Sequence, residues 1–183
     1  ADDWEQVLHQ AISCVRASGS DPLLARLLDG LFKAHLHRDQ YARLPAIAAE
    51  HLAVAARLGD PERHVVALRN SGLAALHAGR VGEAFDRLEQ AVTEARDPAV
   101  PDGLLRACLD TLGFARWEMG DAATAVSLLE EALAIDGASD RSLRTALHRY
   151  HYGLALTDIG KLDDAERALA AALRTSQEVR DDL

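Results

Sequence analysis

Three segments of the chain repeat one spacing of small and apolar residues, and this repeat restricts the fold more than any other feature of the sequence. In each segment a small residue is followed by Gly seven positions later, then by Ala, Leu and Ala after a further five, four and three positions. The segments begin at Gly72, Gly113 and Gly153, so the period is 41 and then 40 residues. A period of this length is typical of stacked supersecondary units, each of which buries its apolar face against its neighbours.

Each segment predicts a pair of helices joined by a tight turn. The first small residue lies inside a helical pattern, where Gly costs about 1 kcal/mol relative to Ala, so we expect it to allow a close approach between the two helices. The expected contacts in the second helix are Ala84, Ala125 and Ala165. The second Gly suits the left-handed conformation that ends a helix. These turn glycines are Gly79, Gly120 and Gly160.

Signals for helix ends fall between the segments. Gly59 is followed by Asp60 and Pro61, a sequence typical of one helix ending and the next beginning. Residues 97–102 and 136–140 have a similar composition. Residues 41–58 give a weaker fourth match without the paired glycines, and its first helix is expected from Asp21 to near His37. An amphipathic helix is expected around residues 4–15.

The predicted organisation is an N-terminal helix in residues 1–20 and a repeat solenoid in residues 21–183, with about nine helices in all. Its units are expected at about 21–59, 60–97, 101–137 and 140–179. The junctions are too short to be domain linkers, so we expect a single structural domain. The chain begins without a Met, so we expect either a processed protein or, as we favour, a piece of a longer one.

The composition agrees with an all-α protein. Hydrophobic residues make up 49% of the chain and aromatic residues only 4%, and the apolar share is mostly Ala and Leu, which favour helices. A net charge of -9 without a basic run argues against direct nucleic-acid contact. No apolar stretch approaches the roughly 18 residues of a membrane span, and the acidic first residues are unlike a signal peptide. We therefore expect a soluble, cytoplasmic chain with no membrane contact.

No set of residues predicts catalysis, a metal site or a cofactor. Cys14 and Cys108 are far apart in the sequence and are expected to be small buried residues. His148 and His151 have a spacing that metal sites use, but no third ligand is near them in the sequence. No Ser or Cys has a glycine-rich elbow or an adjacent base, and no P-loop string occurs. The chain is therefore predicted not to be an enzyme.

The repeated Gly, Ala and Leu positions resemble the tetratricopeptide repeat (TPR), although the period is longer than the usual ~34 residues. Lengthened units of this kind are similar to those of kinesin light chains and, more so, to the sensor regions of actinobacterial transcriptional regulators that carry a signal-transduction ATPase module. The resemblance covers residues 22–179 and implies a right-handed superhelical solenoid of helical hairpins. It further implies that the first helices of the hairpins line a concave groove for peptides or protein segments.

On this resemblance, the concave face takes its residues from fixed positions around the small Gly of each first helix: three and two before it, and one, four and five after it. The predicted partner-binding groove residues taken from these positions are Arg69, Asn70, Leu73, His77, Asp110, Thr111, Phe114, Trp117, Tyr150, His151, Leu154 and Asp158. The basic clamp by which some family members bind a C-terminal carboxylate is not matched.

Two interpretations of the aromatic residues stay open. In one, Phe114, Trp117 and Tyr150 are apolar anchors for a bound peptide. The polar residues expected to hydrogen-bond the peptide backbone occupy one equivalent position and are Asn70, Thr111 and His151. In the other interpretation, the aromatic residues pack between adjacent repeats as core.

The predicted function is binding of a protein or peptide segment, as the sensor or scaffold region of a bacterial transcriptional or signalling regulator, with a homodimer as a further possibility. One alternative is self-association through the apolar face of the last helix. That face comprises Leu162, Ala165, Leu169, Ala172 and Leu173. Another alternative is a small-ligand sensor, with the ligand near His77, Trp117 and His151.

Overall fold

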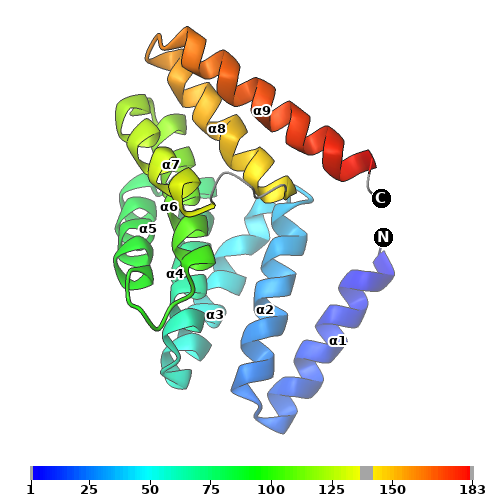
Figure 1. The fold of residues 1–183 in the computed structure, drawn as a ribbon. Helices are drawn as coiled ribbons and strands as arrows, with labels where there is room; N and C mark the ends of the chain where they lie inside the picture. Colours follow the sequence, from blue (N-terminus) through cyan, green and yellow to red (C-terminus); the bar gives the residue numbers. More distant parts are fainter. Residues whose placement is uncertain (1, 137–141, 182–183) are drawn as a thin grey trace. The chain divides into compact units, whose positions relative to one another are not determined.

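The computed structural model describes residues 2–136 and 142–181, and these residues form nine α-helices and one short 3-10 helix without any strand (Figure 1). The all-α fold class is therefore confirmed. The elements are α1 Asp2–Ser18, α2 Asp21–Leu36, η1 Tyr41–Arg43, α3 Leu44–Leu58, α4 Pro61–His77, α5 Val81–Ala95, α6 Asp102–Glu118, α7 Ala122–Asp136, α8 Leu143–Asp158 and α9 Leu162–Asp181.

The helices pair into four hairpins, α2–α3, α4–α5, α6–α7 and α8–α9, and each hairpin corresponds to one predicted repeat. The chain groups into two compact units. The single structural domain expected from the sequence stays a prediction. Unit 1 is Ala1–Val100 and contains α1 to α5, whereas unit 2 is Pro101–Leu183 and contains α6 to α9. The division falls inside the junction predicted at residues 97–102. The junction predicted at 136–140 lies almost wholly outside the described residues.

Local signals in the sequence set the helix ends. Gly59 ends α3 in the left-handed conformation with φ 63°, and Pro61 begins α4 after Asp60, whose side chain accepts a hydrogen bond from the Arg63 backbone N–H at 3.2 Å. The turn glycines inside the hairpins have φ between 73° and 84°. A positive φ costs Gly little because it has no Cβ. The predicted turns at residues 79, 120 and 160 are therefore confirmed.

The glycines inside the first helices lie against the second helices, as predicted, but their nearest partner differs from the expected one. A Cβ atom added at Gly72 would lie 2.6 Å from Leu88 Cγ and 3.2 Å from the Ala84 carbonyl oxygen. At Gly113 the corresponding atom would lie 2.7 Å from Leu129 Cγ. The predicted facing residues are confirmed in part: backbone oxygens of Ala84 and Ala165 lie near Gly72 and Gly153, but the Leu one turn later reaches further across the hairpin and lies nearer.

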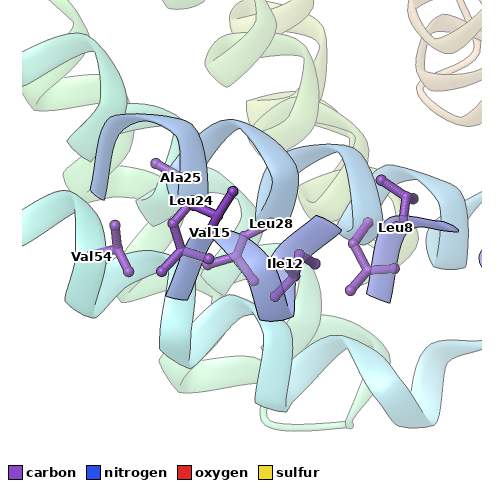
Figure 2. Packing of buried hydrophobic residues seen from close by; sticks show 8 residues of the cluster. Leu8, Ile12, Val15, Leu24, Ala25, Leu28 and Val54 are labelled. Carbon is purple, nitrogen blue, oxygen red and sulfur yellow. The ribbon is translucent and has the colours of Figure 1, made fainter. Parts of the chain in front are cut away.

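The core of unit 1 begins with the predicted amphipathic helix, α1. Leu8 and Ile12 of α1 pack against Leu28 of α2, and Val54 of α3 joins the same cluster (Figure 2). The opposite side of α1 faces solvent, and Val7 is 55% exposed. Burial of one apolar stripe therefore attaches α1 to the first hairpin.

The core of unit 2 is made by the small and branched residues of the repeat. Trp117 of α6 and Tyr152 of α8 pack against it from the side and are only partly buried. The buried members are Ala125, Val126, Leu129, Ala155, Leu156 and Ala165.

The two cysteines differ in environment. Cys108 is buried, as predicted, but Cys14 is exposed, and its predicted burial is wrong. The buried face of α1 is formed by Leu8, Ile12 and Val15, and Cys14, next to Val15 in the sequence, lies outside this face. Among the described helices, none combines the length and the hydropathy that a bilayer span requires.

Candidate partner-binding site

Aromatic rings gather on α6 and α8, the first helices of the two hairpins in unit 2. Phe114 and Trp117 lie one turn apart on α6, with ring centroids 5.7 Å apart. Phe114 also contacts His151 of α8 at 4.7 Å, and Tyr150 lies 5.9 Å from His151. These four side chains form a continuous group that we call the aromatic cluster: Phe114, Trp117, Tyr150 and His151.

The aromatic cluster lies at the boundary between core and solvent. Tyr150 is 47% exposed, whereas the other three rings are half-buried. Trp117 packs on the core of unit 2, yet its indole N–H donates a 2.6 Å hydrogen bond to the exposed carboxylate of Asp158. Each of the two interpretations drawn from the sequence therefore describes part of what these rings do, since one side of the cluster supports the fold and the other side is accessible.

The buried carboxylate of Asp110 holds the His151 ring of the aromatic cluster in place. Asp110 of α6 is 8% exposed, and its Oδ1 lies 3.0 Å from Nδ1 of His151. Its Oδ2 lies 3.7 Å from Nε2 of His148, which is 2% exposed. A carboxylate that accepts from an imidazole N–H sets the orientation of that ring. We call the contact between Asp110 and His151 the unit 2 joint, because it connects the first helices of adjacent hairpins.

Three further predicted residues of unit 2 lie around the cluster. Thr111 is half-buried and donates its hydroxyl to the carbonyl oxygen of Ala107 at 2.7 Å, so this donor is used within α6. Leu154 is half-buried on α8, and Asp158 is exposed at the end of α8. The structure thus brings most of the predicted residues of this unit together on α6 and α8.

Unit 1 has a corresponding joint without aromatic rings. Asn70 of α4 is 1% exposed, and its amide nitrogen donates to Asp29 Oδ1 of α2 at 3.0 Å. The same nitrogen lies 3.5 Å from Nδ1 of the buried His51 of α3, and Lys33 pairs with Asp29 at 2.6 Å. The sequence predicts that the Asn70 amide N–H contacts a bound peptide backbone. This does not fit the arrangement, because the N–H donates its hydrogen bond to Asp29 inside unit 1.

The charges at this unit 1 joint follow from its contacts. Burial raises the pKa of Asp29, but hydrogen bonds from Lys33 and Asn70 lower it more in total, so it lies below its ordinary value. Burial lowers the pKa of His51; the Asp29 carboxylate opposes this, while Lys33, Arg63 and Arg69 add to it. At neutral pH the joint therefore contains an ionised carboxylate beside a neutral imidazole.

The remaining predicted residues of unit 1 are spread over its interior and surface. Leu73 packs on the cluster around Phe32 and Leu44 and belongs to the core. His77 is exposed and stacks on Tyr41 with ring centroids 4.1 Å apart. Arg69 is half-buried on α4. In unit 1 the predicted groove positions thus contribute mainly to packing.

Asp29 and His51 were not predicted from the sequence, and they line a cleft of about 270 Å³ between α2, α3 and α4. A signal for Asp29 was present, because it precedes Asn70 by 41 residues, the same interval that separates Asp110 from His151. His51 belongs to a second helix of the degenerate repeat, and no comparable signal points to it.

The arrangement favours recognition of a partner. Among residues 2–136 and 142–181, no group of three or more His, Cys, Asp or Glu side chains is placed to hold a metal ion. The aromatic cluster instead combines apolar ring faces with an accessible indole and a carboxylate, the chemistry by which protein surfaces bind apolar and polar parts of one segment.

A comparison with protein families gives a match over residues 49–172, from within α3 to within α9. The family is described as "T7SS, ESX-1 secretion system protein EccA1, N-terminal domain". The chain belongs to this family. The matched range includes the whole aromatic cluster and the unit 2 joint, whereas Asp29 of the unit 1 joint lies outside it. A comparison with curated protein sequences gives no match.

Solved structures similar to this chain are TPR-like. Nearly identical TPR-like repeats of a putative kinesin light chain from Podosopora anserina align at a TM-score of 0.68 and 19% identity, over 97% of this chain and 88% of that chain. BtubC (BKLC) from P. vanneervenii aligns at 0.73 and 16% identity, over 96% and 73%. MamA aligns at 0.62 and 18% identity, over 95% and 91%. The predicted TPR-type fold is therefore confirmed.

Proposed function

We propose that this chain is a protein-binding repeat domain that holds an apolar segment of a partner against the aromatic cluster of unit 2. The observation that carries the proposal is the gathering of Phe114, Trp117, Tyr150 and His151 on two adjacent first helices, in a chain with only 4% aromatic residues. Binding, without catalysis, is the proposed activity.

The chemistry of the cluster supports this role. Rings that are half-buried are already ordered by the core, so binding a segment costs little additional side-chain entropy. Asp110 orients His151 from below, and Asp158 orients the Trp117 indole from the side. The site is therefore preorganised, and a partner with an apolar side chain flanked by hydrogen-bond donors would fit it.

The family suggests the setting. Because the family is described by an ESX-1 secretion system protein, we propose that the bound segment belongs to another component or to a cargo of a secretion system of this type. The role in a transcriptional or signalling regulator, the cytoplasmic location and the small-ligand alternative remain predictions from the sequence. The observation that supports the small-ligand alternative is the proximity of Trp117 and His151 to Phe114.

An array of overlapping peptides from the proteins encoded beside this chain would test the proposal. Affinities of the peptides that bind are then measured by Trp117 fluorescence in a Trp4→Phe background, because the chain has two tryptophans. Phe114→Ala is expected to weaken binding at least tenfold, since truncating a central aromatic contact costs about 1.4 kcal/mol or more.

Met119→Ala is the matched control, because Met119 is 48% exposed at the end of the same helix and lies outside the aromatic cluster. This control should bind as the wild type does. A Phe114→Ala variant that binds normally but loses about 3 kcal/mol or more of unfolding free energy would contradict the proposal and assign the ring to the core.

A further inference from the structure

Carboxylates adjoin the aromatic cluster at the ends of both of its helices. Asp158 is the last residue of α8, and its Oδ2 accepts a hydrogen bond from the Trp117 indole N–H at 2.6 Å. Glu118 is the exposed last residue of α6 and follows Phe114 by four positions, so the two lie on one face of the helix. Both carboxylates come five residues after the small Gly of their helix. The rings therefore border negative charge on α6 and on α8.

These two carboxylates can accept further hydrogen bonds. A carboxylate has about four acceptor positions, and the Trp117 indole uses one of those on Asp158. Side chains of a helix lean toward its N-terminus, so Glu118 can reach back toward the ring one turn earlier. A donor that lies on the aromatic cluster therefore finds acceptors at its edge.

The basic side chains of the turn ends do not neutralise these carboxylates. Arg116 pairs with Asp121 at 3.8 Å, and Arg167 pairs with Asp164. Once these pairs are set aside, Lys161 lies beside three exposed carboxylates, those of Glu118, Asp158 and Asp163. This end of unit 2 therefore carries an excess of negative charge.

The other cations of the packed helices lie away from this end. Arg106 of α6 is 8% exposed, and Arg144 and Arg149 lie in the first half of α8, where Arg149 donates to Thr175 of α9 at 2.8 Å. Helix α7, which packs on α6 and α8, has no Lys or Arg. Residues 101–183 contain 15 acidic and 9 basic side chains. The field around the aromatic cluster thus attracts positive charge.

The rings attract a cation at the same place. The centroids of Phe114 and Trp117 are 5.7 Å apart, and their planes are tilted by 43°. A cation within about 6 Å of a ring centroid is attracted by the face of the ring, and indole attracts it most strongly. One group can lie within this range of both rings. The hydrogen bond from the indole N–H to Asp158 polarises the ring and strengthens this attraction.

Other classes of occupant fit less well. A purely apolar segment over the rings would remove water from the exposed Asp158 carboxylate without supplying a partner, and burial of an unpaired charge is unfavourable. An acidic segment would be repelled by both carboxylates. A guanidinium stacks on aromatic faces and donates two parallel hydrogen bonds to a carboxylate, so it matches the rings and the charges together.

We propose that the segment bound at the aromatic cluster carries an arginine, whose guanidinium lies over Phe114 and Trp117 and pairs with Asp158 and Glu118. This inference rests on the proposed function, because it names the chemistry of the segment that the same cluster binds. An apolar residue beside the arginine contacts Tyr150, which is 47% exposed. Recognition thus requires a cation and an apolar group in one segment.

Two short blocked peptides test the arginine. Each has a Leu followed by one variable residue in a Gly and Ser background, and this residue is arginine in one peptide and citrulline, which has a similar shape without the charge, in the other. Binding is followed by the NMR signal of the Trp117 indole N–H in the Trp4→Phe background. The arginine peptide is expected to shift this signal saturably and to bind about tenfold more tightly than the citrulline peptide.

Charge-removing variants test the two carboxylates. With Asp158→Asn and Glu118→Gln combined, the two peptides should bind alike, while the Asn side-chain oxygen can still accept from the indole N–H and hold the ring. The matched control combines Glu130→Gln and Glu166→Gln, which remove two exposed carboxylates from the second helices α7 and α9. This control should keep the tenfold preference.

Fluorinated tryptophans at position 117 test the ring contact. Each added fluorine makes the indole face less negative, so the affinity for the arginine peptide should fall stepwise, whereas that for the citrulline peptide should stay constant. A purely structural role of the ring would change both affinities equally.

Three results would overturn the arginine assignment. They are equal affinities of the wild type for the two peptides, a preference that survives the double carboxylate change, and no binding of either peptide at low millimolar concentration. Phe114→Ala separates this failure from failure of the proposed function. If it weakens both peptides equally bound by the wild type, the cluster binds segments without reading a cation. If neither peptide binds, the peptide array still decides the proposed function.

Discussion

Within each unit, a polar contact joins the first helices of two neighbouring hairpins. The two contacts have the same spacing along the sequence but different chemistry. In unit 1, Asn70 of α4 bonds Asp29 of α2, and in unit 2, His151 of α8 bonds Asp110 of α6. Each pair is separated by 41 residues. The amide of unit 1 is buried and surrounded by charged groups, whereas the imidazole of unit 2 contacts aromatic rings at 4.7 and 5.9 Å.

This difference shows that the position in the repeat and the type of residue at that position have separate effects on the structure. The repeat position determines that a polar side chain meets an Asp of the preceding hairpin. The residue at that position then determines whether the contact only connects two hairpins, as in unit 1, or also supports a ring cluster that reaches the surface, as in unit 2. Variants that alter one joint or one hairpin at a time can test this separation.

The largest loss of unfolding free energy is expected when a side chain is added where the two helices of a hairpin approach closely. Gly72→Ala would place a Cβ 2.6 Å from Leu88 Cγ, and Gly113→Ala a Cβ 2.7 Å from Leu129 Cγ. Each should lose about 2 kcal/mol of unfolding free energy through overpacking. The control Gly30→Ala has no atom within 4 Å of the new Cβ and should gain up to about 1 kcal/mol. Urea denaturation measures all three, and equal losses at positions 30 and 72 would refute the packing role.

The next effect distinguishes the two joints. Asn70→Ala should cost about 1 to 2 kcal/mol, because it removes a buried donor from the Asp29 carboxylate. His151→Asn, which copies the unit 1 residue into unit 2, should cost only about 1 kcal/mol, because an amide can still reach Asp110 and only the ring contact with Phe114 is lost. Chemical denaturation measures both costs. If His151→Asn proves the more damaging change, the two joints are not equivalent.

A smaller effect of equal size in both units is expected at two helix starts. The side chains of Asp60 and Ser142 each accept a hydrogen bond at 3.2 Å from the third residue that follows, in unit 1 and unit 2 respectively. Replacing either with Ala should cost about 1 kcal/mol. Thermal melting monitored by circular dichroism measures both variants, and no change at Asp60 would show that Pro61 alone positions the start of α4.

The smallest effect is a pH dependence specific to unit 1. Because burial lowers the pKa of His51 below its ordinary value of 6.5, the unfolded chain takes up a proton at a higher pH than the folded chain does. The contribution to stability is thus complete above about pH 6.5 and is lost as the pH falls below it. Melting temperatures from about pH 7.5 to about pH 5.5 should fall more for the wild type than for His51→Gln. Parallel curves for the two proteins would contradict the assignment.

The sequence predicted the helices and hairpins well because local chemistry sets them. The left-handed glycines, the Asp60 cap and the apolar stripe of α1 each act within a few residues. The site was predicted less evenly. The repeat register located the rings of unit 2, but equal treatment of all units placed Asn70 and Leu73 of unit 1 at a groove surface, whereas they are buried or packed on the core.

The sequence by itself determined the helical hairpins, their period and the positions that can meet between neighbouring repeats, because helix periodicity, capping and glycine turns depend on residues close in the chain. Only the tertiary structure decided that Leu88 and Leu129 fill the space at the glycines, that Asp29 and His51 surround Asn70, and that Cys14 faces solvent. These outcomes depend on how far each side chain reaches across to another helix, and the spacing of residues along one chain does not specify that distance.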